Sequence, residues 1–136
     1  MRVVLDTNIL VSALISPRGT TEQIYVAWRE RRFELMTCVE QLDEFQRVTR
    51  YPKLRSRIGA SAAGAMFNGL RTIATIVSSL PEVDRSADPA DNFLLSLAEA
   101  AQADYLVSGD RRGVLLLGSH SSTRIVTASS FAEALA

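Results

Sequence analysis

The sequence contains one cysteine, Cys38, and one histidine, His120, among its 136 residues. A single cysteine excludes an intrachain disulfide and a cysteine-based metal cluster, so we expect a buried and unreactive thiol. His120 lies in the polar stretch Gly-Ser-His-Ser-Ser, which predicts a loop residue. A histidine metal site or a Ser-His-Asp triad would require this one loop residue to fall beside the right partners by chance.

The chain also lacks net charge, because its 15 Lys and Arg residues balance its 15 Asp and Glu residues. No global field therefore attracts nucleic acid, and any such binding must come from a local patch. Lys53 is the only lysine. Arginine suits bidentate phosphate contacts better than lysine does, although a GC-rich genome produces the same bias.

No apolar run in the sequence approaches the length of a membrane span. Asp6 and Asn8 interrupt the first apolar stretch and no cleavage-like site follows, so we expect no signal peptide and a cytoplasmic protein. The hydrophobic content of 47% and the charged content of 22% are typical of a globular chain with a proper core. The length predicts a single domain over residues 1–136.

Short apolar segments alternate with segments of helical periodicity along the chain. Strands are predicted over residues 3–5, 33–38, 104–108 and 124–127. Helices are predicted over residues 9–15, 20–32, 40–49, 61–75, 88–101 and 131–135. Residues 73–77 are open to either a helix end or a strand, and residues 111–123 are poorly patterned, with room for a short helix. This alternation implies right-handed crossovers and a mainly parallel sheet.

Three local patterns make more detailed predictions. Thr20 and Gln23 have the spacing of a capping box at the start of a helix. Ile73 is expected to face inward with the two apolar residues before it on the same helix, Met66 and Leu70. Ser129 or Ser130 is expected to cap the last helix.

Four acids occupy positions that can converge at one edge of such a sheet. Asp6 and Asp110 each end an apolar strand, Asp91 lies in the first turn of a helix, and Glu44 lies in the helix after the second strand. Strand ends and the helix starts that follow them meet at the same edge of a parallel sheet. Clustered carboxylates repel one another unless a proton or a cation is present. A site made only of carboxylates selects a hard cation such as Mg²⁺ or Mn²⁺.

Each acid also has an ordinary structural explanation, and the residues alone leave both readings open. Asp88 is the natural N-cap of its helix, and Asp91 can simply complement the helix dipole. Glu44 can pair with Arg47 three residues later on the same helix. Asp110 can be a turn residue after a glycine. Asp6 is the hardest to explain in this way, because it interrupts the exit of an apolar strand.

Several segments together resemble a known family. Residues 3–12, Val-Val-Leu-Asp-Thr-Asn-Ile-Leu-Val-Ser, resemble the opening motif of PIN-domain ribonucleases. Residues 40–48 around Glu44, residues 88–98 around Asp91 and residues 103–110 up to Asp110 resemble the later acidic positions of that family. The similarity extends to the closing Ile-Val-Thr-Ala-Ser-Ser-Phe segment and is greatest to the VapC-like toxin branch of toxin–antitoxin systems.

The resemblance implies a three-layer α/β/α PIN-like domain with a central, mainly parallel sheet of about five strands. It implies a Mg²⁺- or Mn²⁺-dependent endoribonuclease, with Asp6, Glu44, Asp91 and Asp110 as the catalytic, metal-binding acids. Asn8 and Ser108 match positions that steady those acids or a bound water. A VapC-like protein would be the toxin component of a toxin–antitoxin pair, with RNA as substrate, a cognate antitoxin protein as partner and a homodimeric state.

The chain departs from the family pattern after Asp110, where it reads Arg-Arg-Gly instead of an Asp-Leu-Leu type run. Ser108 replaces a common Thr. Glu40 would share a helix face with Glu44, so a contribution of Glu40 stays open, as does one of Asp88.

A basic stretch that contains no acid, residues 47–57, predicts where RNA would bind. The candidates are Arg47, Arg50, Lys53, Arg55 and Arg57, with Arg111 and Arg112 beside the acids as a second group. The alternative explanation is a solvated helix end. The rival to a nuclease is a PIN-like module that binds RNA or protein without cutting. A phosphatase with an aspartyl nucleophile is disfavoured, because it would carry an acid where Asn8 stands.

Overall fold

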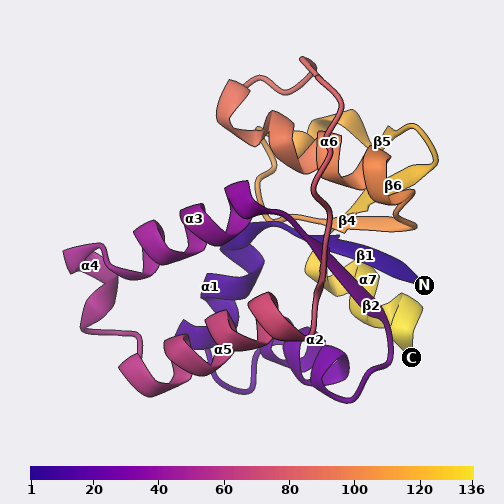
Figure 1. The fold of residues 1–136 in the computed structure, drawn as a ribbon. Helices are drawn as coiled ribbons and strands as arrows, with labels where there is room; N and C mark the ends of the chain where they lie inside the picture. The colour runs from indigo at the N-terminus through magenta and orange to yellow at the C-terminus, as the bar shows by residue number, and fades with distance from the viewer.

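A six-stranded sheet forms the centre of the protein, and the computed structural model describes all residues from 1 to 136 (Figure 1). The strand order is β3-β2-β1-β4-β6-β5. Neighbouring strands pair in parallel, except that β5 is antiparallel to β6. The strands are β1 (Arg2–Leu5), β2 (Glu34–Thr37), β3 (Thr75–Ile76), β4 (Tyr105–Val107), β5 (Ser119–His120) and β6 (Thr123–Val126).

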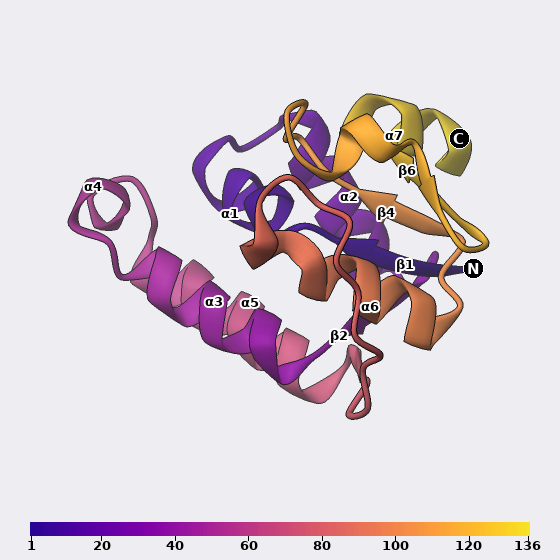
Figure 2. The same ribbon diagram turned by 90° about the horizontal axis from the view of Figure 1, so that it is seen from above.

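Helices cover both faces of this sheet, which gives the three predicted layers (Figure 2). On one side lie α1 (Thr7–Ile15), α2 (Thr20–Arg29) and α7 (Ala128–Leu135), and on the other lies α6 (Asn92–Ala101). Helices α3 (Val39–Thr49), α4 (Pro52–Arg55) and α5 (Ala60–Thr72) extend away from the sheet, and we call them the arm. Two 3₁₀ turns, η1 (Pro89–Asp91) and η2 (Val114–Leu117), complete the chain.

The central strand β1 explains how the two layers of helices are held. Side chains alternate between the two faces of a strand, and every residue of β1 after Arg2 is buried. Val3 and Leu5 belong to the core shared with α1, α2, α5 and α7, whereas Val4 belongs to the core built around α6. The continuous apolar run of β1 is therefore explained by helices packing on both of its faces.

The predicted α/β class and the mainly parallel sheet are confirmed, and the number of strands is six where about five were expected. The additional strand is β5, which has only two residues and lies in the segment that showed no clear pattern. That segment also contains η2, which fits the short helix for which the sequence left room. Residues 75–76 form a strand, so the open choice for residues 73–77 resolves in favour of β3.

Several local predictions were wrong. The predicted capping box is absent, because Thr20 is already the first residue of α2 and Gly19 precedes it without a side-chain cap. Thr127, not a following serine, caps α7 by accepting a hydrogen bond from the backbone N–H of Ser130. Ile73 is 54% exposed, because α5 ends before it and the chain direction changes.

The single cysteine and the single histidine differ in outcome. Cys38 is buried, as predicted, and burial raises the pKa of its thiol to about 11, which keeps it protonated and unreactive. The prediction that His120 is a loop residue was wrong, because it lies in β5 with only 7% of its surface exposed. None of the helices combines the length and the apolar character that crossing a membrane requires.

The buried side chain of Gln41 ties the arm to the end of the central strand. Its amide nitrogen donates to the carbonyl oxygen of Leu5 at 2.6 Å, and its amide oxygen accepts from the hydroxyl of Thr37 at 2.6 Å. Gln41 is fully buried, so losing either partner would leave a polar atom unsatisfied. This pair of bonds holds α3 against the carboxyl end of β1, where Asp6 begins.

Candidate functional site

The topology creates a crevice between two neighbouring central strands. From β1 the chain crosses over to β2 on one side, and it later returns to form β4 on the other side of β1. In open α/β sheets, ligands bind at the carboxyl ends of the strands at this kind of switch point. Asp6 follows β1 directly, and residues 108–110 follow β4 directly. The backbone N–H of Asp6 donates to the carbonyl of Val107 at 2.9 Å, so the two strand ends lie in contact.

Asp6 is the most buried acid at this crevice, with 5% of its surface exposed. It is the N-cap of α1, where its Oδ1 accepts from the backbone N–H of Asn8 at 3.2 Å. Its Oδ2 accepts from the hydroxyl of Ser108 at 2.8 Å. Burial raises the pKa of Asp6 and the charges of Glu44 and Asp110 raise it further, whereas the two hydrogen bonds lower it.

Ser108 connects the first acid to the last one. Its fully buried hydroxyl oxygen donates to Asp6 and accepts from the backbone N–H of Asp110 at 3.1 Å. The carboxylate of Asp110 in turn accepts from the backbone N–H of Arg112 at 3.1 Å, as a turn residue would. One serine therefore fixes the position of both strand-end acids relative to each other.

Asp91 is the last residue of the 3₁₀ turn η1 and directly precedes α6. Burial, as the largest cause, and the nearby charges of Asp6, Asp88, Asp110 and Glu44 together raise the pKa of Asp91 to about 6. The other three predicted acids are thus close enough for their charges to act on Asp91. That these four acids form one site stays a prediction.

Glu44 fits both of the interpretations that the sequence left open. It projects from α3 with 22% of its side chain exposed, and its carboxylate lies 4.0 Å from the guanidinium of Arg47. Its charge also contributes to the raised pKa values of Asp6 and Asp91. The Arg47 side chain is 61% exposed, so water screens this pair and leaves the carboxylate available.

The two additional acids considered from sequence lie differently. Asp88 caps η1 by accepting from the backbone N–H of Ala90 at 3.0 Å, and its charge also acts on Asp91. Glu40 faces a separate cavity with Pro81 and Asn92, and its charge is not among those that raise the pKa of Asp6 or Asp91. The structure therefore favours Glu44 over Glu40 as the acid that faces the crevice.

The predicted basic residues fall into two exposed groups. Four residues of the first group, Arg50, Lys53, Arg55 and Arg57, lie at the far end of the arm. The fifth, Arg47, lies on α3 beside Glu44. The protein has three ion pairs, and none of them involves these four residues. Each of the four therefore has no carboxylate within 4.0 Å. Arg111 and Arg112 are exposed directly after Asp110.

The supporting residue Asn8 is also exposed, and it contacts Asp6 through its backbone rather than its side chain.

The donor atoms at the crevice suit a hard divalent cation, because they are carboxylate and hydroxyl oxygens. No three His, Cys, Asp or Glu side chains are arranged closely enough to enclose an ion by themselves. Mg²⁺ needs no such cage, since it keeps several waters and is held by one or two carboxylates together with substrate phosphates. An open group of acids with coupled charges fits that mode of binding.

Gly113 is a feature of the site that the sequence did not indicate. A Cβ atom there would lie 2.5 Å from Oδ2 of Asp110 and 3.4 Å from Oδ2 of Asp91. The space beside the Asp110 carboxylate therefore favours glycine at this position. The missing side chain lets the loop after β4 pass close to both carboxylates.

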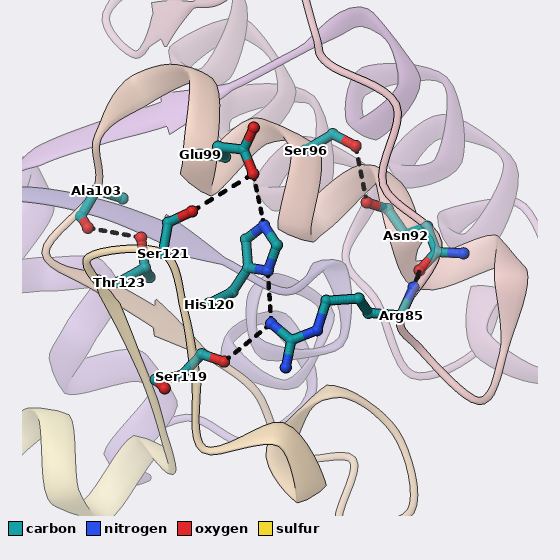
Figure 3. Close-up of polar contacts among 9 residues, drawn as sticks. All are labelled: Arg85, Asn92, Ser96, Glu99, Ala103, Ser119, His120, Ser121 and Thr123. Carbon is teal, nitrogen blue, oxygen red and sulfur yellow. Dashed lines mark hydrogen bonds and ion pairs between the residues drawn. The ribbon is translucent and has the colours of Figure 1, made fainter.

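A polar cluster around His120 was also not predicted from the sequence (Figure 3). The guanidinium of Arg85 donates to Nδ1 of His120 at 2.7 Å, and Nε2 of His120 contacts Glu99 at 2.8 Å. Arginine only donates, so Nδ1 accepts and the Nε2–H group donates to the carboxylate of Glu99. Asn92 accepts from the backbone N–H groups of Arg85 and Ser86. The cluster fastens the segment before α6 to β5 and so fixes where Asp91 emerges.

Residues 2–112 match the sequence profile described as the PIN domain, and the chain therefore belongs to the PIN domain family. PIN domains are in general nucleases and typically use a divalent metal. The matched residues include all four acids and end one residue before Gly113.

Two known proteins resemble the chain over most of its length. It is 26% identical over 112 residues to the uncharacterized protein MJ1680 of Methanocaldococcus jannaschii, an alignment that spans 82% of this chain and 72% of that protein. The PIN domain of human SMG5 superposes with a TM-score of 0.52 at 18% identity, covering 98% of this chain and 99% of that one. At this identity the second similarity concerns the fold alone.

We expect the substitution Gly113→Ala to weaken Mn²⁺ binding by about tenfold or more, because the new methyl group would displace the Asp110 carboxylate. Gly109→Ala is the matched control, since a Cβ there meets nothing within 4 Å. Isothermal titration calorimetry of both variants measures the affinity directly. Equal affinities for the two variants would show that Gly113 has no influence on the acids.

The raised pKa of Asp91 predicts a pH-dependent effect on stability. Folding shifts this pKa from 3.8 to about 6, so the folded state holds the proton more tightly across that interval. Ionisation of Asp91 therefore lowers the free energy of unfolding as the pH rises from about 4 to about 6, and the loss persists above that. Asp91→Asn should consequently stabilise the protein at pH 7.5 more than at pH 4 in EDTA. Urea unfolding at both values, with the exposed Asp43→Asn as control, measures this difference, and a pH-independent difference would contradict it.

Proposed function

We propose that the protein is a metal-dependent endoribonuclease that hydrolyses RNA phosphodiester bonds. The observation that supports it most is the coupling of Asp6, Glu44, Asp91 and Asp110 at the switch point of the sheet. Two of these acids have raised pKa values, so their ionised forms are disfavoured without a cation. Repulsion among neighbouring carboxylates destabilises a fold, and a bound divalent ion would relieve that repulsion.

The four acids would hold Mg²⁺ or Mn²⁺, which when bound neutralises phosphate charge and lowers the pKa of water. The residues of the chain would position the reactants. Asp6 is oriented by Ser108 and by the backbone of Asn8, and each of its oxygens keeps a lone pair free for a ligand. Asp110 is aligned by the same serine. Both ring nitrogens of His120 are engaged with Arg85 and Glu99, so the proposal includes no histidine base.

The resemblance to the VapC-like branch supports a finer proposal, in which the protein is the toxin component of a toxin–antitoxin pair. The antitoxin partner and the homodimeric state expected from that resemblance stay predictions. A cytoplasmic location stays a prediction as well. None of these is required for the proposed chemistry, which depends only on the acids at the crevice.

The second candidate function is a PIN-like module that binds RNA or protein without cutting. It would need no cation, and acids without a cation carry the full cost of their repulsion. An inactive domain would be more stable with amides at these positions, because amides do not repel one another. The raised pKa of Asp91 therefore favours the nuclease over this alternative.

We expect Mn²⁺ or Mg²⁺ to support cleavage of end-labelled RNAs, including a tRNA, and EDTA to abolish it. Asp6→Asn and Glu44→Gln should each lower the cleavage rate by roughly 10²-fold or more, because each removes a carboxylate that would hold the divalent ion beside the reacting phosphate. The matched control is Asp43→Asn, whose side chain is exposed on the same helix beside Glu44.

Product formation resolved on sequencing gels gives the rate of each variant. Equal loss of activity in Asp43→Asn would assign the effect to helix α3 instead of to the acid. Folded protein that cuts no RNA and binds no Mn²⁺ would contradict the proposed function and favour the non-cutting module.

A further inference from the structure

The arm contains a cavity of about 580 Å³ that lies outside the acidic crevice. Helices α3 and α5 pack against each other, and α4 lies at their far end (Figures 1 and 2). The cavity occupies the space between these three helices, and its volume is within the range of small-ligand sites, about 300 to 1,000 Å³.

The cavity is lined by aromatic rings on one side. Phe45 and Phe67 stack with their ring centroids 6.1 Å apart and their planes 8° from parallel. Phe67 remains partly exposed, and the guanidinium of Arg71 lies 5.8 Å from its ring centroid. A partly exposed aromatic ring beside cations is the kind of surface on which an unstacked base rests.

Two arginines complete the lining on the solvent side. Arg50 and Arg55 both line the cavity and are exposed, and neither has a carboxylate within 4.0 Å. No residue of the lining is acidic, and Gln46 and Thr49 add neutral hydrogen-bonding groups. The combination of an apolar aromatic wall, neutral polar groups and two free guanidinium groups matches a nucleotide, whose base is flat and whose phosphate is anionic.

The cavity is also placed well for a chain that reaches the acids. Its residue Phe45 is the immediate neighbour of Glu44 on α3, and its residues Thr49 and Arg50 lie at the end of the same helix. A single strand lying along α3 would therefore contact the crevice and the cavity at different nucleotides. Lys53 and Arg57 are exposed near the cavity and add positive charge to that end of the arm.

We propose that the cavity between α3, α4 and α5 binds one nucleotide of single-stranded RNA, with the base against Phe67 and the phosphate on Arg50 and Arg55. This proposal rests on the proposed function for the choice of RNA as ligand. The arm would then bind the RNA at a second site, outside the acidic crevice. Two separate contacts on one strand make binding tighter than either contact alone.

The test uses two kinds of variant that remove different contacts. In Arg50→Gln/Arg55→Gln the phosphate contacts are lost, whereas in Gly64→Leu a side chain fills the cavity from a position where a Cβ meets nothing within 4 Å. The matched controls are Arg29→Gln/Arg124→Gln, two exposed arginines outside the arm, and Ala65→Leu, an exposed neighbour on α5 outside the lining. Thermal unfolding checks that every variant is folded.

Binding of a fluorescently labelled, mixed-sequence RNA of 12 nucleotides is measured by anisotropy in EDTA, so that cleavage does not interfere. Both cavity variants should bind at least about fivefold more weakly than the wild type. The arginine variant should also show a salt slope shallower by about 0.7 for each lost phosphate contact, whereas Gly64→Leu should keep the slope. The controls should bind as the wild type does.

The outcomes separate the cavity from the chemistry. Cavity variants that bind RNA like the wild type would overturn the proposal, even when the wild type cuts RNA with Mn²⁺. Cavity-dependent binding without any cleavage would support the cavity and contradict the proposed nuclease. A leucine-containing acidic peptide that binds more tightly than RNA, and is lost in the same variants, would overturn the proposal in favour of a protein partner.

Discussion

The buried carboxylate of Asp6 is the interaction on which the arrangement of the site depends. It ends the central strand, caps α1 and accepts the hydroxyl hydrogen of Ser108, so it joins β1, α1 and β4 through one side chain. Gln41 holds the residue before it from the other direction. The two helical layers can pack tightly only because β1 is apolar on both faces until this position. The first charged group after the strand must therefore lie at the edge of the sheet.

The same arrangement has a cost that the rest of the structure does not remove. Burial and neighbouring carboxylates raise the pKa values of Asp6 and Asp91, and no arginine or lysine is buried beside them. Arg47 offers Glu44 only a screened contact at 4.0 Å. A protein selected for stability alone would replace these acids. Keeping them makes sense when a cation and an anionic substrate complete the charge balance during function.

Much of this was predictable from sequence, for reasons that differ between elements. The strand before Asp6 and the helix after Asp88 were readable because apolar periodicity and capping residues are local signals. The expectation that distant acids lie at one edge followed only from the predicted parallel sheet. The role of Gly113 was not, because it depends on how closely a loop approaches two carboxylates. The burial of His120 was missed for a related reason, since its partners Arg85 and Glu99 are distant in sequence.

The proposed function requires that the clustered carboxylates bind a divalent cation. Thermal unfolding with and without Mn²⁺ tests this binding most directly. A ligand that binds only the folded state raises the free energy of unfolding, by about 2.7 kcal/mol at 100 times its dissociation constant. We expect Mn²⁺ to raise the unfolding temperature of the wild type at pH 7.5, and Asp6→Asn to be more stable without metal and to respond far less to it. An unfolding temperature that is unchanged by Mn²⁺, or raised equally in both proteins, would contradict the account.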